Sequence, residues 1–230
     1  MKKLLFIVLS LLVFSTMSQA QRKTYTTTGG ELIFSFANLN INGADVPSTI
    51  RFSPVFNIQT QVHHDLTDRF GLLTGFNLRN VGFIYDDPVN KGTYYKVRNY
   101  TVGLPIGIKV GDMDGRFVFA GYEIELPFVY KQKTFVNDEK TDKFEEWFSP
   151  RIPTFYHSVF LGFGVAEGVQ LKFKYYLNNW YNKGYTDGTG AQPYANFNAN
   201  VFYFALTFQI FRGTHFDYPG KSSSSATSTL

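Results

Sequence analysis

The chain has 230 residues, a formal net charge of +4, no cysteine, and an aromatic content of 18%. This length suits a single domain, and the absence of cysteine excludes disulfide bonds, a catalytic thiol and a lipid-modified N-terminal cysteine. Lys2 and Lys3 lie in a leader, and the sequence shows no Lys/Arg cluster elsewhere. The charge therefore predicts no nucleic-acid partner.

Residues 1–20 have the three parts of a secretory signal peptide. Lys2 and Lys3 open the segment, an apolar run follows, and the end is the small-residue stretch Ser18-Gln19-Ala20. The alternative is a membrane anchor, but the apolar run is too short to span a bilayer core of roughly 30 Å. The sequence therefore predicts cleavage after Ala20 and a short polar lead over residues 21–28.

Eight segments of the remaining chain alternate between apolar and polar side chains, which is the period of a β-strand. In the clearest hairpin, over residues 99–128, Leu104 and Ile106 share an apolar face with Ile124 and Leu126, which follow the polar turn GDMDG. Pro54 lies inside another segment and predicts a bulge there. The predicted strands are residues 31–39, 50–64, 69–85, 99–110, 118–128, 154–165, 169–181 and 196–211.

The connections between these strands alternate between long and short. The long ones are residues 40–49, 86–96, 131–153 and 182–195, and tight turns lie between them. An even number of antiparallel strands with short turns at one rim and long loops at the other is typical of outer-membrane barrels. The predicted fold is all-β, an eight-stranded antiparallel up-and-down transmembrane β-barrel over residues 29–211. The Ser-rich residues 212–230 are predicted to be a disordered periplasmic tail.

The two faces of the strands predict the sidedness of the barrel. One face carries Phe, Leu, Ile and Val, and the other carries glycine, hydroxyl groups and charge. A charge facing lipid costs roughly 2–4 kcal/mol near the bilayer midplane, so we expect the charged face to line the lumen, where opposite charges can pair. A secreted carrier with its apolar face inward is the alternative. The predicted lumenal polar network is Glu31, Arg51, Arg79, Lys109, Glu123, Glu125, Lys172 and Lys174.

Several aromatic residues lie near the long-loop ends of the predicted strands. An aromatic girdle is expected at this level of a membrane barrel, where rings meet the lipid head groups. The predicted girdle residues are Tyr85, Tyr94, Tyr95, Tyr100, Tyr130, Tyr156, Trp180 and Tyr181.

Four stretches carry a resemblance to a known family. The leader ends SQA-Q, one strand reads YTVGLPIGIKVG, the next FVFAGYEIELPF, and the last VFYFALTFQIF. Over residues 29–211 the chain resembles the small outer-membrane β-barrel proteins of Gram-negative bacteria, and most of all the porin-like outer membrane β-barrel domain group of the Bacteroidota. The resemblance implies a place in the cell outer membrane, contact with outer-membrane lipid or lipopolysaccharide, and insertion by the barrel-assembly machinery. One departure is that Phe211 precedes a tail instead of closing the chain.

His157 and Ser158 are the candidates for nucleophilic catalysis. Some eight-stranded outer-membrane barrels are lipid A-modifying enzymes, which use a His and a Ser two residues apart with a supporting carboxylate. Here the two residues are adjacent, so on a strand they point to opposite sides and cannot share a proton. The position two after His157 is Val159. The sequence therefore predicts no catalytic residue and puts His157 at the interfacial rim.

Two further groups could carry chemistry. His63, His64 and Asp65 lie together near a short turn, but a metal site needs more converging ligands than one strand face offers, so we expect solvated turn residues. Glu123 and Glu125 are two apart and both inward. Paired carboxylates can do acid–base work, but these two are expected to neutralise lumenal cations. The sequence predicts no metal, cofactor or nucleotide site.

The leading functional prediction is a non-enzymatic outer-membrane barrel with a lumen filled by side chains. Its long outer loops, above all residues 131–153, would serve surface interaction or envelope integrity. The first alternative is a narrow channel for small solutes, because the predicted lumenal cations outnumber the anions by five to three. The second alternative is a lipid A-modifying enzyme.

Overall fold

The computed structural model describes residues 23–113, 115–166 and 168–213, and its regular elements are all β-strands. The predicted cleavage site and nearly all of the predicted tail lie outside these residues. Among the described residues, no helix has the length and apolar character needed to cross a membrane. The strands are β1 (Lys23–Ile41), β2 (Ala44–Val46), β3 (Ser48–Thr49), β4 (Arg51–Ser53), β5 (Ile58–Asp65), β6 (Phe70–Asp86), β7 (Thr93–Gly111), β8 (Phe117–Val136), β9 (Glu139–Trp147), β10 (Tyr156–Ala166), β11 (Val169–Tyr176) and β12 (Phe197–Arg212).

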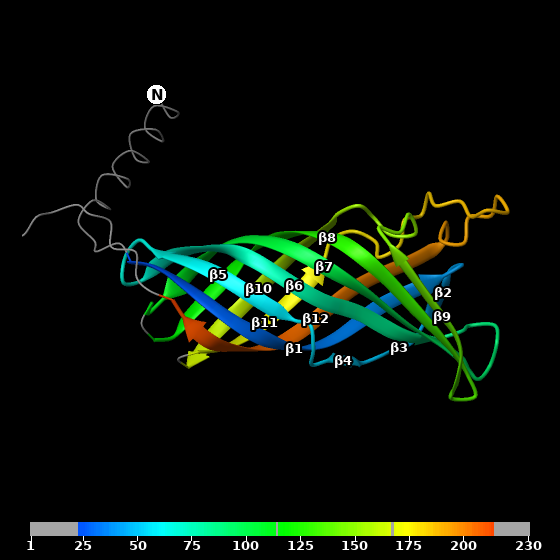
Figure 1. Cartoon of the computed structure of the whole chain (residues 1–230), viewed down its shortest axis with the longest axis horizontal. Coiled ribbons are helices and arrows are strands. Elements are labelled where there is room, and N and C mark those ends of the chain that lie inside the picture. Colours follow the sequence, from blue (N-terminus) through cyan, green and yellow to red (C-terminus); the bar gives the residue numbers. More distant parts are fainter. Residues whose placement is uncertain (1–22, 114, 167, 214–230) are drawn as a thin grey trace, which may run out of the picture.

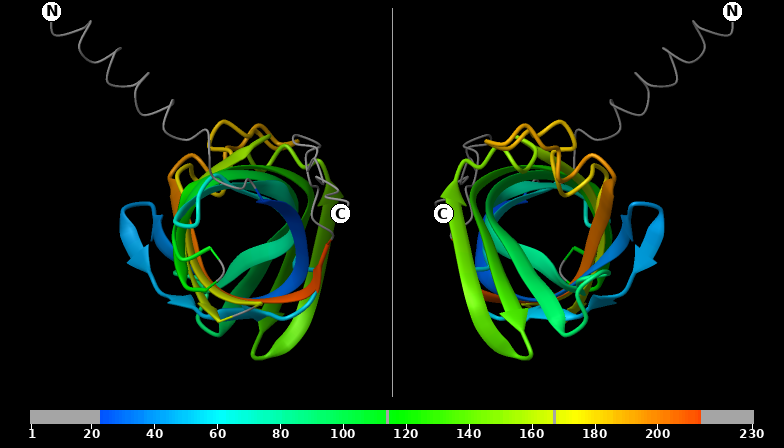
Figure 2. Two further views of the ribbon diagram at one scale, coloured as in Figure 1. Left: turned by 90° about the vertical axis from the view of Figure 1, so that its left-hand side faces the viewer. Right: turned by 90° about the vertical axis from the view of Figure 1, so that its right-hand side faces the viewer.

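Eight of these strands close into a barrel. They pair antiparallel in the order β10-β11-β12-β1-β5-β6-β7-β8, and β8 also pairs with β10, which joins the two ends of the order into a ring. Figure 2 shows this ring from both ends. The first strand, β1, pairs with the last strand, β12, and Leu32 lies opposite Leu206. The predicted eight-stranded, antiparallel, up-and-down barrel is therefore confirmed.

The two rims of the barrel differ (Figure 1). Short turns join β5 to β6, β7 to β8 and β10 to β11 at one rim, and Lys23, the first residue of β1, pairs there with Asp65. The opposite rim carries the longer connections and the strand extensions. We call the two ends the short-turn rim and the outer rim.

Three of the four long connections predicted as loops contain paired strands instead. Residues 40–49 contain β2, which pairs with β1, and β3, which pairs with β6. Residues 131–153 contain the outer part of β8 and all of β9, which pair along the length of β9. Asn137 and Asp138 join them with φ angles of 51° and 67°, the left-handed pair that a two-residue type I′ turn needs. Likewise β6 and β7 stay paired as far as Asp86 and Tyr94. These strand extensions lie beyond the lipid-facing wall, so they need no apolar face. Their charged sequences therefore lack the alternation from which strands were predicted.

The N-terminal half of the wall also differs from the prediction. β1 begins at Lys23 and pairs with β5 from that residue, so residues 23–28 belong to the wall and are not a polar lead. Their threonines favour a strand through β-branching, but they show no apolar alternation. The predicted second strand is divided into β4 and β5, which both pair with β1. The interruption at residues 54–57 is longer than the bulge expected from Pro54.

The outer wall of the barrel is apolar. Leu104 and Phe204 are 56% and 53% exposed, whereas Lys109 and Lys172 are 0% and 5% exposed. Alternation along each strand therefore sends the apolar side chains outward and the charged ones inward. A closed ring pairs its own backbone groups, so a wall of this kind can face hydrocarbon without an exposed strand edge.

Candidate functional site

Glycines on the inner face make room for long side chains from neighbouring strands. A Cβ atom at Gly103 of β7 would overlap the carboxylate of Glu123 on β8. A Cβ atom at Gly71 of β6 would lie 2.5 Å from Asp65 Oδ1 and 2.9 Å from Lys109 Cε. The interior of an eight-stranded barrel is just wide enough for side chains, so glycine on one strand decides where the neighbouring charge can lie.

Six of the predicted lumenal residues meet at one level of the interior, and we call them the central ion cluster. They are Glu31, Arg79, Glu123, Glu125, Lys172 and Lys174. Three cations and three anions from β1, β6, β8 and β11 make the cluster balanced in charge. Each member is at most 5% exposed.

Arg79 is the centre of the cluster. Its Nε lies 2.6 Å from Glu31 Oε2, and its Nη1 contacts Glu123 and lies 3.7 Å from Glu125 Oε1. Arg79 is on β6, whereas Glu31 is on β1 and the other two carboxylates are on β8, so each contact passes over an intervening wall strand. Asn77 Nδ2 also donates to Glu123 Oε1 over 2.9 Å. The guanidinium therefore joins strands that share no backbone hydrogen bonds.

The two lysines of β11 complete the cluster. Lys172 contacts Glu31, and Lys174 contacts Glu125 and lies 2.8 Å from Glu123 Oε2. Tyr176 donates its hydroxyl to Glu125 Oε2 over 2.9 Å. The carboxylates are thus shared between Arg79 and one lysine each, which compensates for much of the cost of burying them.

The other two predicted residues lie apart from the cluster. Lys109 Nζ lies 2.5 Å from Asp65 Oδ1 and 3.2 Å from the Tyr25 hydroxyl, near the short-turn rim. Arg51 donates to Asn80 Oδ1 over 2.7 Å and to the Asn80 carbonyl over 3.2 Å. Sequence reasoning missed Asp65 as an interior partner. Its position could have predicted this role, because Asp65 lies on β5 two residues after inward-facing His63 and so shares its face.

His63 and Asp65 are buried, so the prediction of solvated turn residues is wrong for both. His63 is 1% exposed, its ring stacks on Tyr25 at 4.7 Å with an interplanar angle of 11°, and its Nε2 lies 2.9 Å from Thr27 Oγ1. Both side chains are covered because β1 begins earlier than predicted and places Tyr25 and Thr27 beside the end of β5 at the short-turn rim. Among the described residues, no group of three or more His, Asp or Glu side chains lies close enough to hold a metal ion.

Aromatic rings occupy the interior at the outer end, where the sequence predicted an outward girdle. Tyr85, Tyr130, Tyr156, Trp180 and Tyr181 are each at most 7% exposed and belong to one buried cluster with further rings. The girdle prediction is therefore wrong for these five. Tyr85 and Tyr156 share the inward parity of Arg79 and Ser158 on their own strands, and Tyr130 lies beyond a register shift between β7 and β8 that changes the alternation of β8. Trp180 and Tyr181 follow the last residue of β11, where alternation no longer applies, and Trp180 N donates to the Ala199 carbonyl. We call this cluster the aromatic layer.

Hydrogen bonds tie the aromatic layer together. The Tyr156 hydroxyl donates to the Trp180 carbonyl over 2.6 Å and accepts from Asn99 Nδ2 over 2.8 Å. The rings of Tyr156 and Trp180 stack at 5.0 Å, and those of Tyr181 and Tyr194 at 4.3 Å. Such pairs add about 0.5–1.5 kcal/mol each beyond the burial of their area, so the layer is fixed in place.

A cationic contact joins the outer hairpin to the connection that follows β11. The Arg151 guanidinium lies 4.7 Å from the Phe144 ring and 5.0 Å from the Tyr185 ring, and it donates to the Tyr194 hydroxyl over 3.3 Å. Phe144 is on β9, and the two tyrosines precede β12. Arg151 therefore links β9 to the connection between β11 and β12 beside the aromatic layer, to which Tyr194 belongs.

His157 and Ser158 lie on opposite sides of the wall. His157 Nδ1 bonds the Tyr122 hydroxyl on the outside, whereas buried Ser158 donates its hydroxyl to the Glu123 carbonyl over 3.1 Å on the inside. No shared proton position exists between the two side chains.

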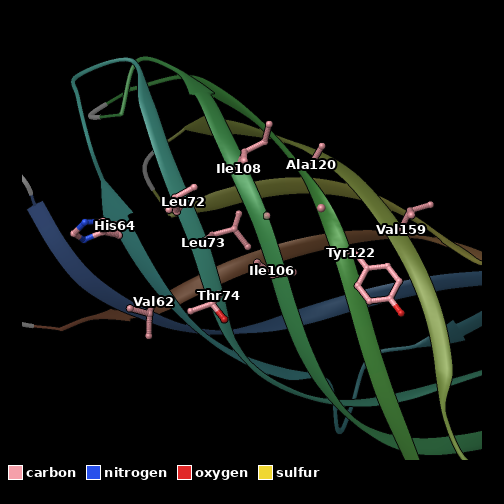
Figure 3. Close-up of a pocket in the computed structure, with 12 residues that line it drawn as sticks. Val62, His64, Leu72, Leu73, Thr74, Ile106, Ile108, Ala120, Tyr122 and Val159 are labelled. Carbon is pink, nitrogen blue, oxygen red and sulfur yellow. The ribbon is translucent and has the colours of Figure 1, made fainter. Parts of the chain in front are cut away.

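The outer wall has an apolar hollow of about 800 Å³ near Tyr122, shown in Figure 3. It is lined by strands from β5 to β10. Leu72 of β6 lies opposite Ile108 of β7, and the small side chain of Ala120 lies next to Ile108 on β8. Hydrocarbon chains can fill such a depression. It carries no converging polar groups, so it lacks the features of a catalytic pocket.

Fold and interior together define a closed β-barrel with an apolar outer wall and an interior occupied by paired charges and aromatic rings. No protein-family model and no curated protein matches the chain. Among solved structures it is similar to Ail, the attachment invasion locus protein of Yersinia pestis, in complex with the heparin analogue sucrose octasulfate, at 7% identity over 83% of this chain and 99% of that one, with a TM-score of 0.38.

Two further solved structures are similar at the same level. Neisserial surface protein A matches at 10% identity over 83% of this chain and 96% of that one, with a TM-score of 0.38. The outer membrane protein OprG of Pseudomonas aeruginosa matches at 10% identity over 86% and 98%, with a TM-score of 0.36. At these values the likeness says nothing about activity or ligand.

Proposed function

We propose that this protein is a non-enzymatic barrel of the Gram-negative outer membrane, closed to solutes, whose outer hairpins serve surface interaction or envelope integrity. The observation that carries the proposal is the order of side-chain layers along the interior. The Lys109–Asp65 pair, the central ion cluster and the aromatic layer follow one another from the short-turn rim to the outer rim. A solute would have to break each of them in turn.

The contacts of the central ion cluster support a closed bore. Arg79 reaches Glu31 across β5 and reaches Glu123 across β7, and Lys174 reaches Glu123 across β10. Links between strands that are not neighbours cross the interior instead of following the wall. Ions could pass only by separating buried, charge-assisted hydrogen bonds.

A narrow channel is the less favoured function. The prediction of a channel rests on five lumenal cations against three anions. Asp65, paired with Lys109, adds a fourth buried anion and leaves an excess of one cation among the described lumenal residues. A lipid A-modifying activity has weaker support still, because His157 and Ser158 point to opposite sides of the wall.

The location and partners of the protein belong to the same proposal. The apolar wall and the leader suit the cell outer membrane, with outer-membrane lipid or lipopolysaccharide around the barrel and the barrel-assembly machinery as its insertion partner. The porin-like barrel group of the Bacteroidota is the proposed family, on the stretches quoted above. We propose no cofactor, metal ion or nucleic-acid partner.

Planar-bilayer recording of the refolded protein tests closure. We expect no stable conductance steps from the wild-type chain. As a matched comparison, Arg79→Ala combined with Trp180→Ala removes one group from the ion cluster and one ring from the aromatic layer, and it should produce brief, small openings. Large, stable conductance from the wild type would refute the proposal, and selectivity for anions would favour the channel.

A further inference from the structure

Three lysines face one another across the outer parts of β7, β8 and β9. Lys96 pairs in register with Lys133, and Lys133 pairs with Lys143. Like charges directly opposite each other destabilise an antiparallel pair. Within the described ranges neither Lys96 nor Lys133 has an ion pair, and Lys143 shares the carboxylate of Glu145 with Lys131. Lys96 Nζ lies 4.7 Å from the Phe135 ring, and this contact offsets only part of the repulsion along the row.

Three more cations extend the row on the same face, and we call the whole set the outer basic patch. Its members are Lys96, Arg98, Lys131, Lys133, Lys140 and Lys143. Burial, together with the charges of Arg98, Lys140, Lys143 and Lys96, lowers the pKa of Lys133. The sequence predicted no basic cluster outside the leader, and that prediction is wrong. Cross-strand pairing brings together cations that lie far apart along the chain.

The patch lies directly above an aromatic band on the lipid-facing side of the wall. The Arg98 guanidinium lies 5.6 Å from the Tyr100 ring, and Lys131 Nζ lies 5.1 Å from the same ring. Phe128 packs against Tyr100 at 6.3 Å and against Trp147 at 5.9 Å. Farther down the same face of β7, Leu104 is 56% exposed. Apolar wall, aromatic band and cations thus follow one another as they do at a membrane interface.

We propose that the outer basic patch binds the phosphate groups of a phosphorylated glycolipid in the outer leaflet. The inference rests on the proposed outer-membrane location and does not depend on whether the barrel conducts. Clustered Lys and Arg side chains suit phosphate oxygens through charge-assisted hydrogen bonds. The continuous apolar wall beneath them favours an anion carried by a lipid over a soluble one, because the acyl chains can pack on the wall while the phosphates reach the cations.

Lipid titration of the full refolded chain in uncharged detergent micelles tests the proposal. The probes are lipid A with two phosphates and the same lipid after phosphate removal, and the readout is bound lipid by native mass spectrometry. We expect Lys96→Gln combined with Lys133→Gln to weaken binding of the phosphorylated lipid by roughly twenty-five-fold, at about a five-fold loss for each lysine that meets a lipid phosphate. Arg69→Gln combined with Lys183→Gln removes the same charge outside the outer basic patch, at the short-turn rim and in the connection between β11 and β12, and should leave binding unchanged.

Equal binding of both lipids by the wild type would overturn the proposal, and so would unchanged binding by the patch variant. A soluble sulfated oligosaccharide that binds as tightly as the lipid and displaces it would also overturn it, because the patch would then be a glycan site. Removing opposed positive charges should not unfold the hairpin, and folding is checked by heat-sensitive gel migration. If the variant fails to fold, the comparison of the two lipids on the wild type still decides. If the protein binds the phosphorylated lipid more tightly than the dephosphorylated one but also conducts ions, only the proposed closure is refuted.

Discussion

Replacement of Arg79 by alanine should destabilise the barrel more than any rim substitution. The side chain makes charge-assisted hydrogen bonds to Glu31 and Glu123, and Glu125 lies 3.7 Å away. Hydrogen bonds to charged groups contribute about 1.5–3 kcal/mol each. Two such bonds give a gross loss of about 3–6 kcal/mol, and breaking a buried ion pair costs about 3–5 kcal/mol.

The lysines of β11 limit this loss. Lys172 keeps its contact with Glu31, and Lys174 keeps its contacts with Glu123 and Glu125, so no carboxylate loses every partner. Three anions would nevertheless face two cations. We therefore expect the free energy of unfolding to fall by about 3–5 kcal/mol.

Urea unfolding of the barrel in lipid vesicles, followed by tryptophan fluorescence, measures this change. The matched control is Arg69→Ala at the exposed short-turn rim, which should stay within about 0.5 kcal/mol of the wild type. Adding Glu123→Gln to Arg79→Ala restores equal numbers of charges and should recover part of the loss. If Arg79→Ala costs no more than Arg69→Ala, the central ion cluster does not hold the barrel together and the reasoning fails.

Three further changes test other parts of the interior and the outer rim. Tyr156→Phe removes a hydroxyl that donates to a buried main-chain carbonyl, and it should lower the free energy of urea unfolding by about 1–3 kcal/mol. Gly103→Ala introduces a Cβ atom that overlaps the Glu123 carboxylate, and it should cost about 1–3 kcal/mol in the same assay, whereas an unchanged midpoint would mean that the carboxylate is free to move. At the β6–β7 turn, burial raises the pKa of Asp87, but hydrogen bonds led by the Asn90 backbone N–H outweigh it and the pKa lies below its ordinary value. Because the pKa is lowered in the folded state, this turn should be most protected from protease above the ordinary pKa of aspartate and lose protection as the pH falls through the lowered value.

Strand alternation made the wall of the barrel predictable. Leu104 and Ile106 had to share a face, and Lys109 had to take the other, because side chains along a strand alternate with period two. The cost of a charge against lipid then selected which face points outward. This argument needs only neighbours along one strand, and it weakened where both faces of a strand are solvated, as in the extension of β8 and β9.

Aromatic residues near the strand ends were assigned to the wrong side for a different reason. Trp180 and Tyr181 follow the last paired residue of β11, where alternation no longer determines the direction of a side chain. Their direction depends on the course of the chain between β11 and β12, where Trp180 N donates to the Ala199 carbonyl. Tyr156 lies on β10 two residues before buried Ser158, so period two already places it inside, and the girdle assignment overlooked that parity.

The sequence by itself determined the number of barrel strands, the alternation of short and long connections, and the division of each strand into an apolar and a polar face. These follow from local periodicity and from turn residues. Only the tertiary structure decided which charges meet. Arg79 with Glu31, Lys109 with Asp65, and the lysine row of β7, β8 and β9 all depend on register between strands and on distance across the interior. Register and closure are properties of the whole ring, since each strand's position depends on its two neighbours, and no segment of the chain contains that information alone.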